Sequence, residues 1–129
     1  VQIDAATFVA THIVPVRYSR QSASGVRVAD SSNISALARL DELGLPLVLH
    51  CHSHPGFGRE SNHPSCTDRA FQERLESGRH VAIGGIFSRD GFVRFFAGNS
   101  RMFKVEVVGN GARRVSNYEY RVELDDTPL

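Results

Sequence analysis

The sequence predicts an α+β domain in which a mixed or mainly antiparallel β-sheet is sandwiched by helices. Short segments rich in branched and aromatic residues, bounded by Gly and Pro, are typical of strands. Two longer segments carry apolar residues at helical spacing, and the strands and helices do not alternate strictly. With 129 residues and 41% apolar content, residues 1–129 are expected to form a single domain with one core.

Composition excludes several classes of partner. The chain has 15 Lys and Arg against 14 Asp and Glu, so it carries no basic surface for nucleic acid and no charge run for a membrane surface. No apolar stretch approaches the roughly 20 residues that a membrane span needs. Two cysteines are too few for a disulfide framework and favour a reducing compartment. We therefore expect a cytoplasmic protein.

The amino-terminal part predicts one strand and a loop. Residues 7–16 are branched and aromatic, which favours a strand. His12 lies on it and is interpreted as a structural residue, because a single histidine on a strand is more often packed or at the surface than a ligand. Residues 17–30 are small and polar and predict a loop, with a short strand at 26–28.

A helix follows this loop. Ser31 or Ser32 is expected to cap its start, and Gly44 is expected to close it. Its apolar stripe consists of Ile34, Leu37, Ala38, Leu40 and Leu43.

A histidine-rich segment follows the apolar run 45–49, which predicts a buried strand. Residues two apart on a strand point to the same face, so His52 and His54 present two imidazoles side by side. His50 shares that face, and the pair His50 and His52 is therefore an alternative. The proline directly after His54 favours the later pair.

The next element is predicted as a helix over 67–77, with Ser65 as N-cap and Gly78 past its end. Asp68 shares a helical face with apolar residues and points toward the core, where a bare charge costs several kcal/mol on an order-of-magnitude scale. Two imidazoles and one carboxylate, with one position left for water, form the ligand set of a catalytic zinc. The alternative is that Asp68 is a capping-box acid paired with Ser65; both roles are compatible.

The carboxyl-terminal part predicts two hairpins. The first joins residues 81–87 and 92–97 through an Asp-Gly turn, and Gly84 in it indicates a close approach by another group. The second joins 102–108 and 115–124 across a Gly-Asn-Gly turn.

The pattern His52-x-His54-Pro55, followed by Ser65-x-x-Asp68, resembles the motif of the JAMM/MPN+ zinc metalloproteases. Members of this family remove ubiquitin or ubiquitin-like tags by cutting isopeptide or peptide bonds. The resemblance runs from about residue 8 to about residue 97, and the style of the loop is similar to the prokaryotic JAB-like branch associated with bacterial ubiquitin-like systems. It implies a cytidine-deaminase-like MPN/JAB fold.

The resemblance also implies roles for individual residues. It makes His52, His54 and Asp68 the ligands of a Zn²⁺ ion, and Ser65 the side chain that stabilises the oxyanion. It implies a ubiquitin-like protein or its conjugate as partner, with activating- and conjugating-enzyme-like proteins as further partners.

In the family, an insertion comparable to residues 17–30 contacts the ubiquitin-like protein. Tyr18 and Arg20 are therefore candidate contacts, and a solvated loop is the alternative.

Two features depart from the family pattern. The spacer between His54 and Ser65 is longer than in eukaryotic members. The family also carries a catalytic Glu on a strand before the motif, whereas Glu42 lies in the predicted helix and does not receive that role. The expected explanation is that the Glu-bearing strand precedes residue 1; an inactive enzyme or a different base are the alternatives.

Three functions follow from these observations. The first is a zinc isopeptidase or peptidase that releases a ubiquitin-like modifier. The second is a catalytically inactive MPN-type module that binds a ubiquitin-like protein or scaffolds a conjugation complex. The third is a zinc hydrolase of small amides or peptides.

The remaining reactive side chains near the motif are given minor roles. His63 is interpreted as a loop residue that does not bind metal, and Arg59 and Glu60 as rim or solvated residues. Cys51 faces away from the histidines and is expected in the core. Cys66, in the first helical turn, would be the nucleophile of a Cys-His site, the least favoured alternative.

Overall fold

The structure is a computed structural model that describes residues 1–16, 18–22, 25–28, 30–99 and 101–123, with the backbone alone for those between 18 and 32. In chain order, the elements of this described part are β1 (Tyr18–Ser22), β2 (Gly25–Val28), α1 (Asp30–Leu43), β3 (Leu49–Ser53), α2 (Cys66–Ser77), β4 (Ile83–Phe87), β5 (Phe92–Phe96), β6 (Ala112–Ser116) and β7 (Glu119–Val122).

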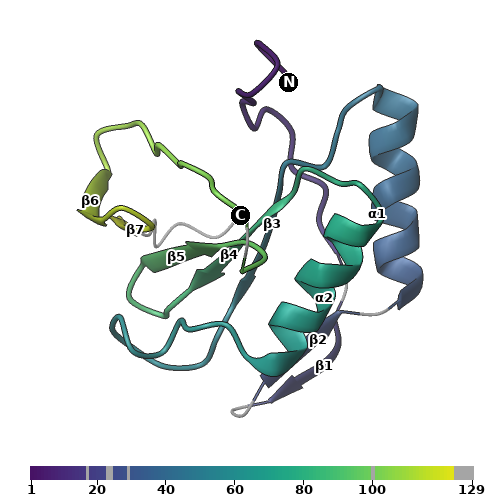
Figure 1. Cartoon of the computed structure of the whole chain (residues 1–129). Helices are drawn as coiled ribbons and strands as arrows, with labels where there is room; N and C mark the ends of the chain where they lie inside the picture. Colours follow the sequence, from purple (N-terminus) through teal and green to yellow (C-terminus); the bar gives the residue numbers. More distant parts are fainter. Residues whose placement is uncertain (17, 23–24, 29, 100, 124–129) are drawn as a thin grey trace.

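The main sheet has five strands in the order β3-β4-β5-β7-β6. β3 pairs parallel with β4, and the other pairs in this sheet are antiparallel. β1 and β2 form a separate antiparallel hairpin within the stretch predicted as a loop, and the short strand predicted at 26–28 lies in β2. In Figure 1 the β6–β7 hairpin lies at the opposite end of the sheet from the helices. The predicted α+β class and mixed sheet are confirmed.

One face of the sheet is covered by α2, and we call it the helix face. Strand register places His52, Ile86, Arg94 and Glu119 in one row across this face, because each is paired with the next. Side chains paired directly across neighbouring strands point to the same side of a sheet. Gln72 and Leu75 of α2 are buried against it. The helix therefore projects its first turn toward one end of this row.

A glycine allows close packing under α2. A Cβ on Gly84 would lie 2.3 Å from the ring of Phe96, which leaves no room for any side chain there. The ring of Phe96 in turn packs edge-on against His50, with centroids 6.0 Å apart. The predicted close approach at Gly84 is therefore made by an aromatic side chain.

On the helix face Leu75 and Ile86 are buried, and the other part of the core lies on the opposite face of the sheet. Val93, Phe95 and Tyr120 form its buried cluster, and Phe103 and Val105 from the segment before β6 pack against it. A second helical layer was expected on this face. In the part of the chain that the structure describes, this extended segment packs there instead, since its alternate side chains are apolar.

Two predicted strands are wrong in extent. Residues 7–16 contain only one isolated bridge, between Gln2 and Phe8, and Ile13 is 93% exposed. A branched sequence forms a strand only where a ladder partner is available. Apart from the hydrogen bonds that Val9 exchanges with Val1, none of the described residues pairs with 10–16. The strand predicted over 45–49 begins only at Leu49.

The second predicted hairpin is also wrong. Residues 102–108 form no strand, although their side chains alternate between exposed and half-buried. The stretch 115–124 was expected as one strand, but Asn117 and Tyr118 form a turn that divides it between β6 and β7. Asn is a turn-forming residue because its side chain hydrogen-bonds nearby backbone.

The helix limits and the first hairpin agree better with the sequence. Ser65 caps α2, and Gly44 follows α1 with a positive φ of 68°. α1 begins at Asp30, so neither Ser31 nor Ser32 is its cap. β4 and β5 form the predicted hairpin through Gly91, whose φ is 90°.

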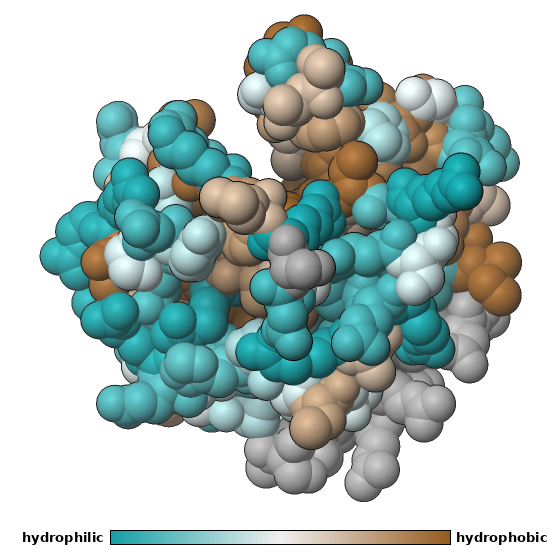
Figure 2. All heavy atoms as spheres, viewed as in Figure 1, coloured by the Kyte–Doolittle hydropathy of each residue, from teal (hydrophilic) through white to brown (hydrophobic). Residues whose placement is uncertain are grey.

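The molecular surface in this view is largely hydrophilic (Figure 2), with apolar side chains gathered toward the amino-terminal segment and the helices. Ile3, Ile13 and Ile34 are among the exposed apolar side chains. No helix in the described residues has the length and apolar content that crossing a bilayer requires.

Candidate metal centre

The end of β3 positions the two predicted imidazoles. His52 is the fourth residue of this strand. His54 lies just beyond it, but its backbone N–H donates to the carbonyl of Phe87 at 2.9 Å, which continues the parallel register by one residue. The two side chains therefore share the helix face, as strand alternation predicts.

The first turn of α2 positions the carboxylate. Ser65 has the extended backbone of an N-cap, with φ −80° and ψ 172°. Its hydroxyl accepts from the N–H of Asp68 at 3.1 Å, and its own N–H donates to Oδ2 of Asp68 at 2.8 Å. This reciprocal capping box fixes the carboxylate on the side that faces β3. The capping role of Asp68 and its predicted position beside the histidines are therefore both present.

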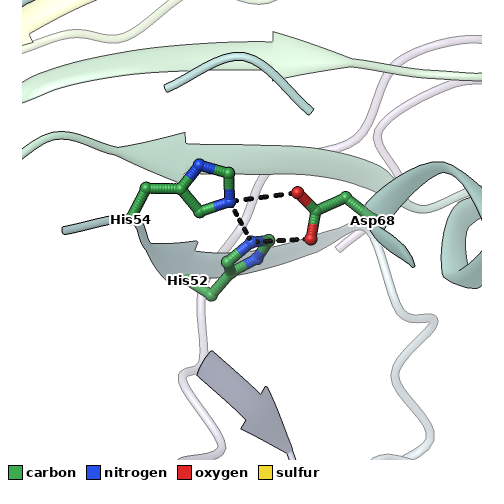
Figure 3. Close-up of side chains that lie close together, drawn as sticks. All are labelled: His52, His54 and Asp68. Atoms are coloured by element: carbon green, nitrogen blue, oxygen red, sulfur yellow. Dashed lines mark hydrogen bonds and ion pairs between the residues drawn. The ribbon is translucent and has the colours of Figure 1, made fainter. Parts of the chain in front are cut away.

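Ligand atoms from three side chains converge at this point (Figure 3). Nε2 of His52 and Nε2 of His54 lie 3.2 Å apart, and each lies 3.0 Å from one carboxylate oxygen of Asp68. A tetrahedral zinc with ligands at about 2.0 to 2.2 Å has ligand-to-ligand edges of about 3.3 Å. The group His52, His54 and Asp68 can therefore hold a metal ion.

The hydrogen bonds of His54 decide where its lone pair points. Nδ1 lies 3.1 Å from the carbonyl oxygen of Ser61, and because a carbonyl only accepts, Nδ1 carries the hydrogen. In the neutral ring, Nε2 then presents a lone pair to a carboxylate oxygen of Asp68 3.0 Å away. Two acceptors at that distance repel each other unless a proton or a metal cation lies between them. The donor set thus fits a cation.

The surroundings of Asp68 favour its ionised form. Burial alone would raise its pKa, but hydrogen bonds from His52 and from the backbone and hydroxyl of Ser65, together with the charge of His52, bring the pKa well below its ordinary value. The side chains of His52, His54 and Asp68 are 15%, 19% and 12% exposed. The carboxylate of Asp68 is therefore ionised, and the cluster is still accessible from solvent.

The other histidines lie outside the cluster. Nε2 of His50 is 2.6 Å from Oε1 of Gln72, and burial lowers the pKa of His50. The alternative pair of His50 and His52 is therefore not the one that the structure brings together with a carboxylate. His63 and His12 are exposed and belong to no such group of described residues.

The cysteines and Glu42 also lie apart from the cluster. Cys51 points away from the histidines as predicted, but it is exposed rather than part of the core, because β3 is an edge strand. Cys66 is exposed at the first position of α2. Glu42 is paired with Arg39 on the surface of α1.

Of the remaining candidates, Arg59 is half-exposed and forms an ion pair with a buried carboxylate, while Glu60 is exposed. The side chains of Tyr18 and Arg20 lie outside the described part of the chain.

Sequence reasoning missed one set of residues that supports the centre. Ser61 supplies the carbonyl that orients His54, and Asn62 next to it is completely buried and accepts from Arg94. Glu119 is also completely buried and accepts from Arg94 and Arg59. Ser61 and Asn62 are polar residues in a loop, and such residues are usually expected at the surface. The sequence therefore carried no signal that they would be buried or would support the metal centre.

Comparisons with known proteins found no match: no family model fits the chain, and no curated protein or solved structure resembles it significantly.

Proposed function

We propose that this protein is a zinc-dependent hydrolase of the JAMM/MPN+ type that cleaves a peptide or isopeptide bond to a ubiquitin-like modifier. One observation carries the proposal. The Nε2 atoms of His52 and His54 and the carboxylate of Asp68 converge within 3.2 Å of one another, and Ser65 lies beside them in the same capping box. The motif spacing therefore brings together in space the residues to which the family resemblance gives roles.

The ligand set favours zinc and a catalytic site. His52, His54 and Asp68 would hold the ion through two nitrogens and one oxygen, which leaves a fourth position free. When bound, zinc supplies a Lewis acid and lowers the pKa of a coordinated water to about 7. The Ser61 carbonyl on Nδ1 of His54 and the Ser65 N–H on Asp68 orient two of the three ligands.

Ser65 is suited to donate a hydrogen bond to a developing oxyanion. Its hydroxyl oxygen already accepts from the N–H of Asp68, which fixes the oxygen, and the residue is exposed. The hydroxyl proton is also directed at the carboxylate of Asp68, whose pKa it lowers, and in the hydrolase it would turn from that carboxylate toward a substrate carbonyl. A donor of this kind contributes about 10² to 10³ in rate.

The alternative function is an inactive module that binds a ubiquitin-like protein. Its support is that, in the part of the chain that the structure describes, no acid other than Asp68 joins the cluster. Glu119 is engaged by Arg59 and Arg94, and Glu42 lies on the surface of α1. A hydrolase of this type needs a carboxylate to move a proton to the leaving amine.

Zinc analysis followed by a cleavage assay tests the proposal. The parent protein and His54→Ala are dialysed against trace zinc, and bound zinc is measured by mass spectrometry. His63→Ala is the matched control, because this exposed histidine lies in the loop between His54 and Ser65 but outside the cluster. We expect stoichiometric zinc in the parent and in His63→Ala, and its loss in His54→Ala.

The zinc-loaded protein is then given a linear fusion of a ubiquitin-like protein to a reporter. Cleavage that stops on chelation supports the hydrolase, and binding of the fusion without cleavage supports the inactive module. Equal zinc in parent and His54→Ala would remove the metal centre and with it the proposal. Cleavage that survives chelation would point to Cys66.

A further inference from the structure

We infer that Arg94, held in place by the buried Glu119, is a positioning residue for the metal ligand His54. The inference rests on the proposed metal function and concerns a residue on another strand. It follows from one continuous set of contacts between the sheet and residues 55–64, which we call the motif loop.

The motif loop joins the two halves of the metal site. His54 precedes it, and Ser65 and Asp68 follow it. The loop is anchored at its start by backbone bonds, since the N–H of Arg89 donates to the carbonyl of Gly56 at 2.8 Å. The N–H of Gly58 also donates to the carboxylate of Asp90 at 2.8 Å. The second half of the loop needs another anchor.

Arg94 supplies this anchor. Its Nε donates to Oδ1 of Asn62 at 3.1 Å, and its Nη2 donates to the carbonyl of Arg59 at 3.2 Å. The planar guanidinium therefore holds the loop on both sides of Ser61, through two donors in a fixed geometry. Asn62 is completely buried, so this contact is shielded from competition by water.

Glu119 fixes the guanidinium in turn. Its Oε2 accepts from Arg94 at 3.4 Å and from Nε of Arg59 at 2.7 Å. The carboxylate is completely buried, and its other oxygen has no hydrogen-bond partner among the described residues. A buried carboxylate beside two guanidinium groups is held in place strongly, because leaving it unpaired would be costly.

The chain of contacts ends on the metal ligand. Ser61 lies between Arg59 and Asn62, the two loop residues that Arg94 contacts. Its carbonyl accepts from Nδ1 of His54 at 3.1 Å. That bond sets the orientation of the imidazole and leaves Nε2 directed at Asp68. Hydrogen-bond partners of metal-binding histidines typically change metal affinity by about 10- to 100-fold when they are lost. Arg94 acts one step further out, through the position of this carbonyl.

The test replaces Arg94 with Lys, which keeps a cation beside Glu119 but cannot make both loop contacts. The matched control is Arg101→Lys. Arg101 also bridges backbone carbonyls, at Ala82 and Val81, and approaches the carboxylate of Glu76 at 3.9 Å, but it does not touch the motif loop. Arg59→Gln is a second variant. Its side chain is 51% exposed, so its loss does not empty a core position.

Two measurements are made on each variant. Zinc affinity is measured by competition with a chromophoric chelator. In metal-free protein, NMR follows the imidazole Nδ1–H proton of His54, which is expected to be protected from exchange with water while it donates to Ser61. We expect Arg94→Lys to bind zinc about 10-fold or more weaker and to lose this protection. Arg59→Gln should lower zinc affinity and Nδ1–H protection as well, but by less. Arg101→Lys should leave both quantities unchanged.

Zinc affinity and Nδ1–H protection equal to the parent in Arg94→Lys would overturn the inference. If that variant does not fold, the same result in Arg59→Gln would overturn it. A parent that binds no zinc would remove the proposed function, but the NMR measurement on metal-free protein would still decide whether Arg94 positions His54.

Discussion

Asp68 lies on α2 beside His52, at one end of the row on the helix face, and Glu119 is the other end of that row. The partners of these two carboxylates differ in charge. Glu119 accepts from two guanidinium groups, which are always positive. Asp68 faces two imidazoles, which need carry no charge. Both carboxylates are largely removed from solvent, with 0% and 12% of the side chain exposed.

The difference separates a structural ion pair from a binding site. The partners of Glu119 belong to the chain, so its charge is compensated in the folded protein under all ordinary conditions. His52 donates to Asp68, but Nε2 of the neutral His54 presents a lone pair to the same carboxylate, and only a cation from solvent compensates that contact. The first arrangement stabilises the fold, and the second creates affinity for a proton or a metal ion.

The largest effect expected from this comparison is on stability without metal. Glu119→Gln leaves two guanidinium groups without their carboxylate and should lower the free energy of unfolding by about 3 kcal/mol, the low end for a broken buried pair because Arg59 is half-exposed. Asp68→Asn keeps an oxygen for the Ser65 N–H, so it should cost less than about 1 kcal/mol. Urea unfolding in the presence of chelator measures both. An Asp68 variant as unstable as the Glu119 variant would contradict the comparison.

The next effect appears when zinc is added. At free zinc about 100-fold above its dissociation constant, binding should stabilise the parent by about 2.7 kcal/mol, which is roughly 10 °C in unfolding midpoint. His54→Ala should lose this shift because one ligand is missing, while His63→Ala should keep it. Thermal unfolding with and without zinc provides the measurement. The same shift in parent and His54→Ala would place zinc elsewhere.

Much of the metal site was predictable from sequence, because its determinants are local. His52 and His54 are two residues apart on a strand, and Ser65 and Asp68 are three apart at a helix start. These spacings fix the direction in which the four side chains point, independently of the rest of the fold. The convergence of the two elements was expected from the cost of burying Asp68, and the distances agree with it.

The support of the site was not predictable, because it depends on strand pairing. Glu119 meets Arg94 only through the β5–β7 register, and the sequence predicted a different hairpin for that region. The turn at residues 117–118 carries Glu119 into the sheet. No periodicity in 112–124 distinguishes one long strand from two short ones joined by a turn. The predicted strand at 7–16 failed for the related reason that a strand pattern does not specify a partner.

A smaller effect on stability is expected at Ser65, which belongs to the site but not to the ligand set. Ser65→Ala removes the oxygen that accepts from the N–H of Asp68 and should cost about 1 kcal/mol of stability. Zinc affinity should change little, since the backbone N–H to Asp68 remains. If the hydrolase proposal is right, the turnover rate should fall by about 10² to 10³. Turnover unchanged in this variant would remove the oxyanion role of Ser65.

The smallest effect distinguishes the two anchors of the motif loop by pH. Hydrogen bonds from the N–H of Gly58 and from Ser88 lower the pKa of Asp90 below its ordinary 3.8. A carboxylate with a depressed pKa stabilises the folded state above the unfolded value, and this contribution is lost as the pH falls through the folded value. The Gly58 anchor should therefore weaken only below pH 3.8, whereas the loop acceptors of Arg94 are an amide oxygen and a backbone carbonyl, which carry no acidic proton.

NMR of the Gly58 amide between about pH 5 and about pH 2 follows this loss. Its chemical shift should titrate with a midpoint below 3.8, and Asp90→Asn should abolish the titration because the remaining amide is neutral. A midpoint at or above the ordinary carboxyl value would mean that Asp90 does not hold the loop, and the anchoring of residues 55–64 would then depend on backbone bonds and on the contacts of Arg94 and Arg59.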